Sequence, residues 1–201
     1  MRKSFLMRFL AVALLSGSAW AQRIQNFDIF IAGGPAWSKS HAIGGTNVTL
    51  ADSCGFGSET AYGYQVARAS AASLWIEYGM VFPNPGLKAN VPVSSSSRTG
   101  FAATLGLRFM VPVNSRLSFY AVSGGGGGSF WVAEVTGGAN PSVYTYSTSH
   151  GLFVFGGGAD LRLSRWFSLR AEVRDLVTGK ELSGAPGRHH VLPLFGVAGH
   201  F

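Results

Sequence analysis

The sequence predicts an all-β protein, an eight-stranded antiparallel up-and-down transmembrane β-barrel. Three observations predict this fold class. Apolar and polar residues alternate with period 2 in stretches of about ten residues, the connections between these stretches are alternately short and long, and the alternation continues to the last residue. Strands of about 9 to 11 residues, tilted by about 45°, are the length that crosses a bilayer.

Residues 1–21 have the layout of a secretory signal peptide. A basic start precedes an apolar run over 9–15, and small residues flank Trp20. The apolar run is far shorter than the roughly 18 residues that a spanning helix needs. We therefore expect a cleaved signal peptide over 1–21 and an outer-membrane β-barrel domain over 22–201.

The composition excludes some other classes of protein. Gly occurs 28 times, charged residues make up 12% of the chain, and Cys54 is the single cysteine. One cysteine cannot form an intramolecular disulfide. We expect Cys54, in the first long loop, to be an unpaired thiol, the alternative being a disulfide between two molecules. The net charge of +7 comes from dispersed Lys and Arg residues, so we expect no nucleic-acid partner.

The stretch 168–175 illustrates the alternation. Leu169, Ala171 and Val173 share one face, while Arg170, Glu172 and Arg174 share the other. Applied to the whole chain, this pattern predicts eight strands, at residues 27–37, 60–69, 73–82, 99–111, 116–129, 150–163, 167–176 and 190–201.

The connections predict an up-and-down barrel with two different rims. Three are short, at 70–72, 112–115 and 164–166, and four are long and rich in Gly, Ser, Pro and Asn, at 38–59, 83–98, 130–149 and 177–189. Short turns at one rim and long loops at the other place both ends of the barrel at the short-turn rim. Because lipid cannot satisfy an open sheet edge, the first and eighth strands must pair.

The polar face is expected to lie inside. A soluble lipocalin-like barrel turns its apolar face inward around a ligand, whereas a transmembrane barrel turns it toward lipid and encloses a polar interior. Aromatic residues near strand ends, such as Phe27, Trp37 and Phe82, favour the transmembrane barrel, because such rings lie at membrane interfaces. The residues expected to form a polar network in the interior are Glu77, Arg108, Tyr120, Asp160, Arg162, Arg170, Glu172, Arg174 and His200.

The hairpin of the sixth and seventh strands has two plausible registers. If residue 163 pairs with 167, Asp160 lies opposite Arg170, and glycines lie opposite Glu172 and Arg174. A shift by two residues would instead set like charges against each other, so we predict the first register. The glycines then leave room for the long side chains across the hairpin, although they could alternatively serve only to bend the strand.

The chain end supports a membrane location. Phe195, Val197, Gly199 and Phe201 occupy alternate positions, and this pattern resembles the C-terminal assembly signal of bacterial outer-membrane barrels. Together with the signal peptide and the loop lengths, the chain resembles the eight-stranded outer-membrane β-barrel proteins of the OmpA, OmpX and OmpW type, with a barrel and no periplasmic domain. The resemblance implies residence in the outer membrane of a Gram-negative-type bacterium, with both termini periplasmic. It also implies outer-membrane lipid, lipopolysaccharide and the barrel-insertion machinery as partners.

The function expected from these features is structural: envelope stabilisation, or surface recognition through the long loops, by a barrel whose polar interior is filled with side chains. The alternatives are a narrow porin, a lipid A-modifying enzyme at the rim, and a soluble lipocalin-like ligand-binding barrel. His150, Ser149 and His190 are the candidates for a rim enzyme. We assign no catalytic residues, because no nucleophile, base and orienting carboxylate can be placed on neighbouring strands. We also assign no cofactor and no metal residues, because the neighbours His189 and His190 on one strand would point to opposite faces.

Overall fold

The computed structural model describes residues 26–38, 41–42, 49–89, 93–95, 100–136, 142–178 and 189–201. The expected signal peptide lies outside these residues. The strands are β1 (Phe27–Ser38), β2 (His41–Ala42), β3 (Thr49–Arg68), β4 (Ser73–Ala89), β5 (Val93–Ser95), β6 (Phe101–Pro112), β7 (Leu117–Thr136), β8 (Ser142–Arg162), β9 (Phe167–Thr178) and β10 (His189–His200). The described residues contain no helix long and apolar enough to cross a membrane.

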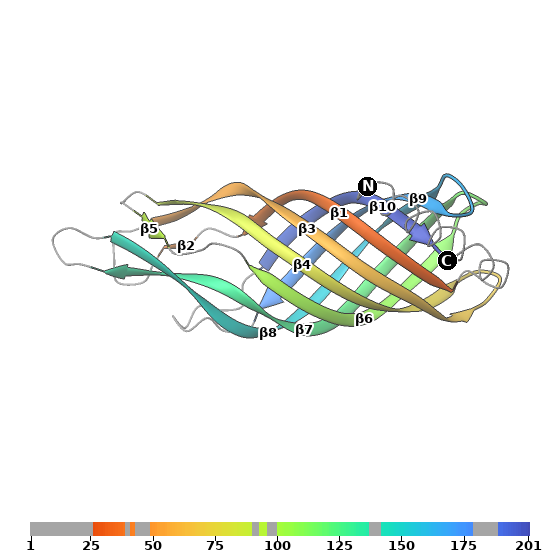
Figure 1. The fold of residues 1–201 in the computed structure, drawn as a ribbon, viewed down its shortest axis with the longest axis horizontal. Coiled ribbons are helices and arrows are strands. Elements are labelled where there is room, and N and C mark those ends of the chain that lie inside the picture. The colour runs from red at the N-terminus through yellow and green to blue at the C-terminus, as the bar shows by residue number, and fades with distance from the viewer. Residues whose placement is uncertain are drawn as a thin grey trace, which may run out of the picture.

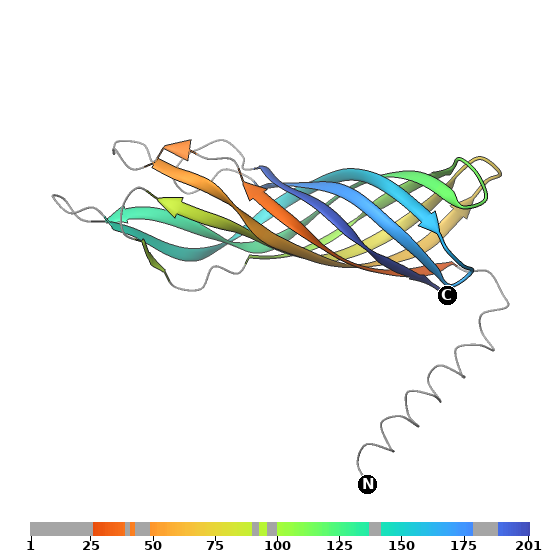
Figure 2. The same cartoon turned by 90° about the horizontal axis from the view of Figure 1, so that it is seen from above.

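Eight of these strands close into an antiparallel barrel, as predicted (Figures 1 and 2). Their order around the barrel is β1, β10, β9, β8, β7, β6, β4 and β3, and β1 pairs with β3 to complete the circle. The first and last barrel strands pair from Asp28 opposite His200 to Ser38 opposite His190, which confirms the expected closure. The two short strands are additions: β2 pairs with β3, and β5 runs parallel to β8.

Three short turns close one rim. Leu163 N donates to Phe167 O at 3.0 Å, and equivalent backbone bonds close the turns at 69–72 and 113–116. Side chains reinforce two of the turns: Asn114 Oδ1 accepts from the backbone N–H groups of Arg116 and Leu117, each at 2.8 Å, and Ser164 Oγ acts in the same way in its own turn.

Four strands are longer than predicted. β3, β4, β7 and β8 have 20, 17, 20 and 21 residues, whereas the other barrel strands have 12 each. The extra residues all lie at the end opposite the short turns, where Figure 2 shows these strands continuing past the others. Much of the sequence expected as loop at 38–59, 83–98 and 130–149 is therefore strand, and Cys54 lies in β3. The alternation is weak there because a strand that extends beyond lipid needs no apolar face.

The predicted register of the β8–β9 hairpin is confirmed. Asp160 lies opposite Arg170, Gly158 opposite Glu172, and Gly156 opposite Arg174. A Cβ atom on Gly158 would lie 2.3 Å from the Ala171 carbonyl oxygen, 2.7 Å from the Tyr120 hydroxyl and 2.8 Å from the Glu172 Cβ. Glycine at this position therefore makes room for polar side chains inside the barrel.

The outer surface is mainly apolar, and most of the charged residues described in the barrel strands are turned inward. Ile31, Leu105 and Phe195 are 63%, 61% and 66% exposed. A row of rings runs along the outside across the closing strands, from Phe201 to Phe27, Tyr62 and Tyr78, with centroids 6.3–6.5 Å apart. This distribution is that of a transmembrane barrel and the reverse of a soluble carrier.

Candidate functional site

The main polar feature of the described interior is a cluster of buried charges, which we call the ionic network. It consists of Asp28, Glu59, Glu77, Arg108, Tyr120, Asp160, Arg170, Glu172 and Arg174, all at most 6% exposed. Seven barrel strands supply these residues. The eighth, β10, joins through His200, because Ser168 Oγ lies 2.9 Å from His200 Nε2 and donates to Asp160 Oδ2 at 2.9 Å.

Arg174 is the centre of one half of the network. Its guanidinium lies 2.9 Å from Glu59 Oε1, 2.6 Å from Glu77 Oε1 and 2.6 Å from Glu172 Oε1. Tyr120 donates its hydroxyl proton to the other oxygen of Glu172 at 2.5 Å. One cation on β9 thus connects carboxylates from β3, β4 and β9 itself.

Arg108 and Arg170 hold the other half. Asp28 Oδ2 accepts from both, at 2.6 Å and 2.8 Å. Arg108 also donates to Glu77 at 2.8 Å, which links the two halves, and Arg170 donates to Asp160 at 2.9 Å. The two guanidinium groups stack on Trp75 and Phe30, with 4.8 Å and 4.9 Å between Cζ and ring centroid.

The inward side chains change from polar to apolar with distance from the short-turn rim. Beyond Arg174 on β9 comes Leu176, and beyond the two glycines of β8 come Val154 and Leu152. These residues belong to a buried apolar cluster that also contains Phe130, Leu192 and Leu194. We call these six residues the apolar layer. In the half of the barrel away from the short turns the interior is therefore mainly apolar, contrary to the expectation of a polar interior, although Thr178 and His190 are also buried there.

The network contains seven of the nine residues predicted for the interior, and an eighth, His200, contacts it through Ser168. The ninth, Arg162, is half-buried and lies at the short-turn rim. Sequence reasoning missed Asp28 and Glu59. Asp28 shares the inward face of β1 with the apolar residues Phe30 and Ala32, so the sequence of this strand shows no polar face that would mark the inside. Glu59 stands one residue before the predicted strand start, and extending that strand by one residue would have found it.

The candidate residues of a rim enzyme do not assemble into a nucleophile and base. Ser149 is exposed and His150 is half-buried on the opposite face of β8, so the two side chains point apart. His190 is buried, and its ring stacks on Phe130 with centroids 5.3 Å apart. Its neighbour His189 is exposed on the outer face, with Nδ1 2.6 Å from Asp175 Oδ2.

The predicted assembly signal lies on the outside of the last strand. Phe195, Val197 and Phe201 are about half exposed or more, and Gly199 shares their face. These side chains therefore project from the barrel wall beside the β1–β10 closure. Recognition of this face during insertion stays a prediction.

No protein-family model matches the chain, and no curated protein matches it. Among solved structures, Neisserial surface protein A aligns over 87% of this chain and 97% of its own, with 15% identity and a TM-score of 0.53. The chain has the fold of the eight-stranded outer-membrane β-barrels.

Two further solved structures align over a similar length. The attachment invasion locus protein Ail of Yersinia pestis has 15% identity over 88% of this chain and 99% of its own, with a TM-score of 0.48. OprG from Pseudomonas aeruginosa has 13% identity over 89% and 99%, with a TM-score of 0.45. At such identities the likeness concerns the fold and not the activity.

Proposed function

We propose that the protein is an integral outer-membrane β-barrel that conducts no solutes and serves as a rigid, envelope-stabilising support for surface recognition at its long-strand end. The observation that carries the proposal is the burial of the ionic network. A water-filled lumen would leave its guanidinium groups in contact with solvent, yet Arg108 is 0% exposed and Arg174 is 1% exposed. The apolar layer adds a second barrier, because moving an ion through packed hydrocarbon is costly.

The strand lengths support a display role. A strand of 12 residues at about 3.3 Å each, tilted by about 45°, rises roughly 28 Å, which matches the hydrocarbon thickness of a bilayer. The four longer strands exceed this by 5 to 9 residues. These additional residues therefore project beyond lipid and extend two hairpins, β3–β4 and β7–β8, into water.

Cysteine labelling of intact cells tests the location and the orientation together. In a Cys54→Ser background, Ser147→Cys places a thiol on the extended part of β8, and Ser70→Cys places one in a short turn. A membrane-impermeant maleimide should label the first in whole cells and the second only after the outer membrane is opened. Labelling of Ser70→Cys alone in intact cells would reverse the orientation, and a soluble, fully labelled protein would overturn the membrane location.

Planar-bilayer recording tests the closed interior. The purified barrel should insert without stepwise ion conductance. Because Arg174 holds three carboxylates inside the barrel, the Arg174→Gln variant serves as the matched comparison, and conductance in that variant alone would show that the network is the barrier. Regular conductance steps from the unaltered protein would instead favour the narrow porin.

A further inference from the structure

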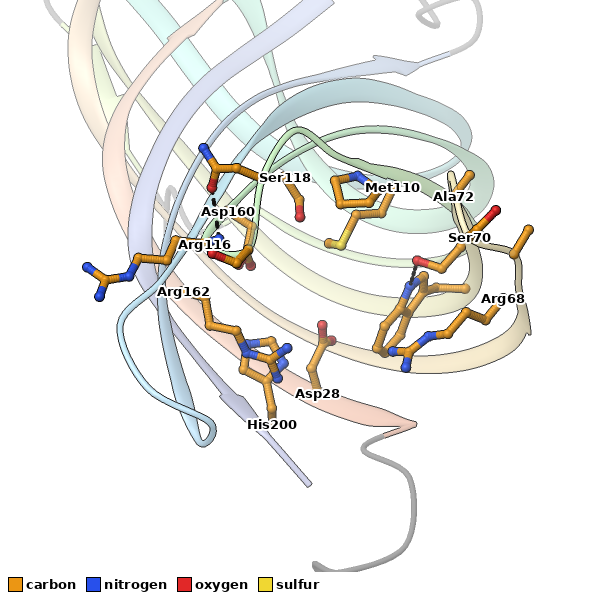
Figure 3. Close-up of a pocket in the computed structure, with 16 residues that line it drawn as sticks. Asp28, Arg68, Ser70, Ala72, Met110, Arg116, Ser118, Asp160, Arg162 and His200 are labelled. Carbon is orange, nitrogen blue, oxygen red and sulfur yellow. Dashed lines mark hydrogen bonds between the residues drawn. The ribbon is translucent and has the colours of Figure 1, made fainter.

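The short-turn rim contains an open pocket with an unusual distribution of charge. The pocket has a volume of about 340 Å³ and is bordered by residues of β1, β3, β4, β6, β7, β8 and β10 (Figure 3). Asp28, Asp160 and His200 lie toward the barrel interior, while Arg68, Arg116 and Arg162 lie around the opening. The role proposed above uses none of this rim.

The carboxylates of the pocket are already paired within the barrel. Asp28 is bound by Arg108 and Arg170, and Asp160 by Arg170 and the Ser168 hydroxyl. Both aspartates are at most 5% exposed. Because their charge is matched from inside the barrel, they are poor partners for guanidinium groups at the opening.

Two of the three arginines at the opening are not neutralised by any acid in the described part of the chain. Arg68 is exposed, and its Nη2 donates to the neutral Gln65 Oε1 at 2.8 Å. Arg116 is also exposed, and Figure 3 shows its side chain projecting at the edge of the pocket. In the same view Arg68 and Arg162 lie on opposite sides of the pocket.

Hydroxyl groups supply further donors. Trp75 Nε1 donates to Ser73 Oγ at 2.9 Å, which occupies a lone pair of that hydroxyl and leaves its proton available to the pocket. Ser70 and Ser118 also line the pocket. The opening therefore offers positive charge together with several hydrogen-bond donors.

We propose that this rim pocket binds a phosphate group. A guanidinium presents paired N–H donors that match two phosphate oxygens, and phosphate has enough acceptor oxygens to engage two arginines and a hydroxyl together. Such a group reaches a barrel rim from two sources, the headgroups of a phospholipid leaflet and soluble phosphate compounds. The inference holds whichever compartment the rim faces, so it does not depend on the proposed function.

Amide NMR of the whole barrel, refolded in the phosphate-free detergent octyl glucoside, tests the site. Inorganic phosphate is titrated at constant ionic strength, with chloride as the replaced anion. We expect saturable shifts in the turns at 69–72 and 113–116. Arg68→Gln and Arg116→Gln should each weaken phosphate binding about tenfold, the cost of one charge-assisted contact.

Arg165→Gln is the matched control. Arg165 is exposed in the neighbouring turn, outside the residues that line the pocket, and its guanidinium stacks on Trp166. This variant removes the same charge from the same rim and should leave phosphate affinity unchanged within about twofold. An equal loss in Arg165→Gln, or unsaturable shifts that chloride also produces, would overturn the site in favour of general rim electrostatics. Heat-modifiable gel migration verifies that each variant is folded.

A second arm identifies the source of the phosphate. The titration is repeated in bilayer discs of phosphatidylglycerol. A large loss of apparent affinity for inorganic phosphate there, absent in Arg68→Gln, assigns the site to lipid headgroups. Unchanged affinity assigns it to a soluble phosphate compound.

Discussion

Replacing Arg174 by methionine tests the ionic network where it is most connected. The Arg174 guanidinium lies within 2.9 Å of carboxylate oxygens on Glu59, Glu77 and Glu172. Methionine fills similar volume but removes the charge, so the described network changes from five carboxylates and three guanidinium groups to five and two. Removing one partner of a buried ion pair costs about 3–5 kcal/mol. Because three carboxylates lose one cationic partner together, although Glu77 keeps Arg108 and Glu172 keeps the Tyr120 hydroxyl, we expect a loss near the upper end, about 5 kcal/mol.

The measurement is the free energy of unfolding in urea, for protein refolded into lipid vesicles and followed by tryptophan fluorescence. Arg116→Met is the control, since it removes an exposed arginine from the rim and should change stability by no more than about 0.5 kcal/mol. Adding Glu59→Gln to Arg174→Met should restore part of the loss, with a coupling energy of about 1–3 kcal/mol.

A free energy of unfolding for Arg174→Met within about 0.5 kcal/mol of that of the unaltered protein, the range of an exposed substitution, would contradict a stabilising role of the network. That result would mean that the buried charges contribute to closing the interior but not to the stability of the barrel. Independent, additive effects of the two substitutions would likewise refute the proposed contact between Arg174 and Glu59.

Three further predictions concern a glycine inside the barrel, the lipid-facing surface and the C-terminal residue. Gly158→Ala should destabilise the barrel by about 1–3 kcal/mol, because its Cβ would lie 2.3 Å from the Ala171 carbonyl oxygen and 2.7 and 2.8 Å from two side-chain atoms. Gly127→Ala, whose Cβ would lie 3.6 Å from its nearest neighbour, should be tolerated, and urea unfolding compares the two variants. Leu105→Arg, on the lipid-facing side of β6, should cost about 2–4 kcal/mol in vesicles, whereas Val113→Arg in a short turn should cost no more than about 1 kcal/mol, and similar losses at both sites would contradict the membrane placement. Phe201→Ser should slow assembly without loss of final stability, as measured by the time course of heat-modifiable folding in cells; unchanged assembly would argue against a C-terminal signal.

The β8–β9 hairpin shows how much of the fold local sequence contains. Its two strands alternate strictly, and their opposite charges are compatible with a single register, so Asp160 could be placed opposite Arg170 in advance. The β3 and β8 extensions show the limit of this information. Outside the bilayer, a strand is held by its neighbour and not by a lipid-facing apolar row, so period 2 fades from the sequence while the pairing continues.

The fold class, the closure of the first strand on the last and the inward direction of most charges could be predicted from the sequence, because a bilayer requires an apolar exterior and satisfied backbone groups at every strand. Which charges meet depends on how the strands are arranged in space. Asp28 and Arg170 lie 142 positions apart in the chain. They meet inside the barrel because β10 pairs with both β1 and β9 and so brings these two strands close together. The apolar layer also depends on closure of the barrel. Its apolar side chains come from separate strands, and they pack into one core only when the eight strands enclose them.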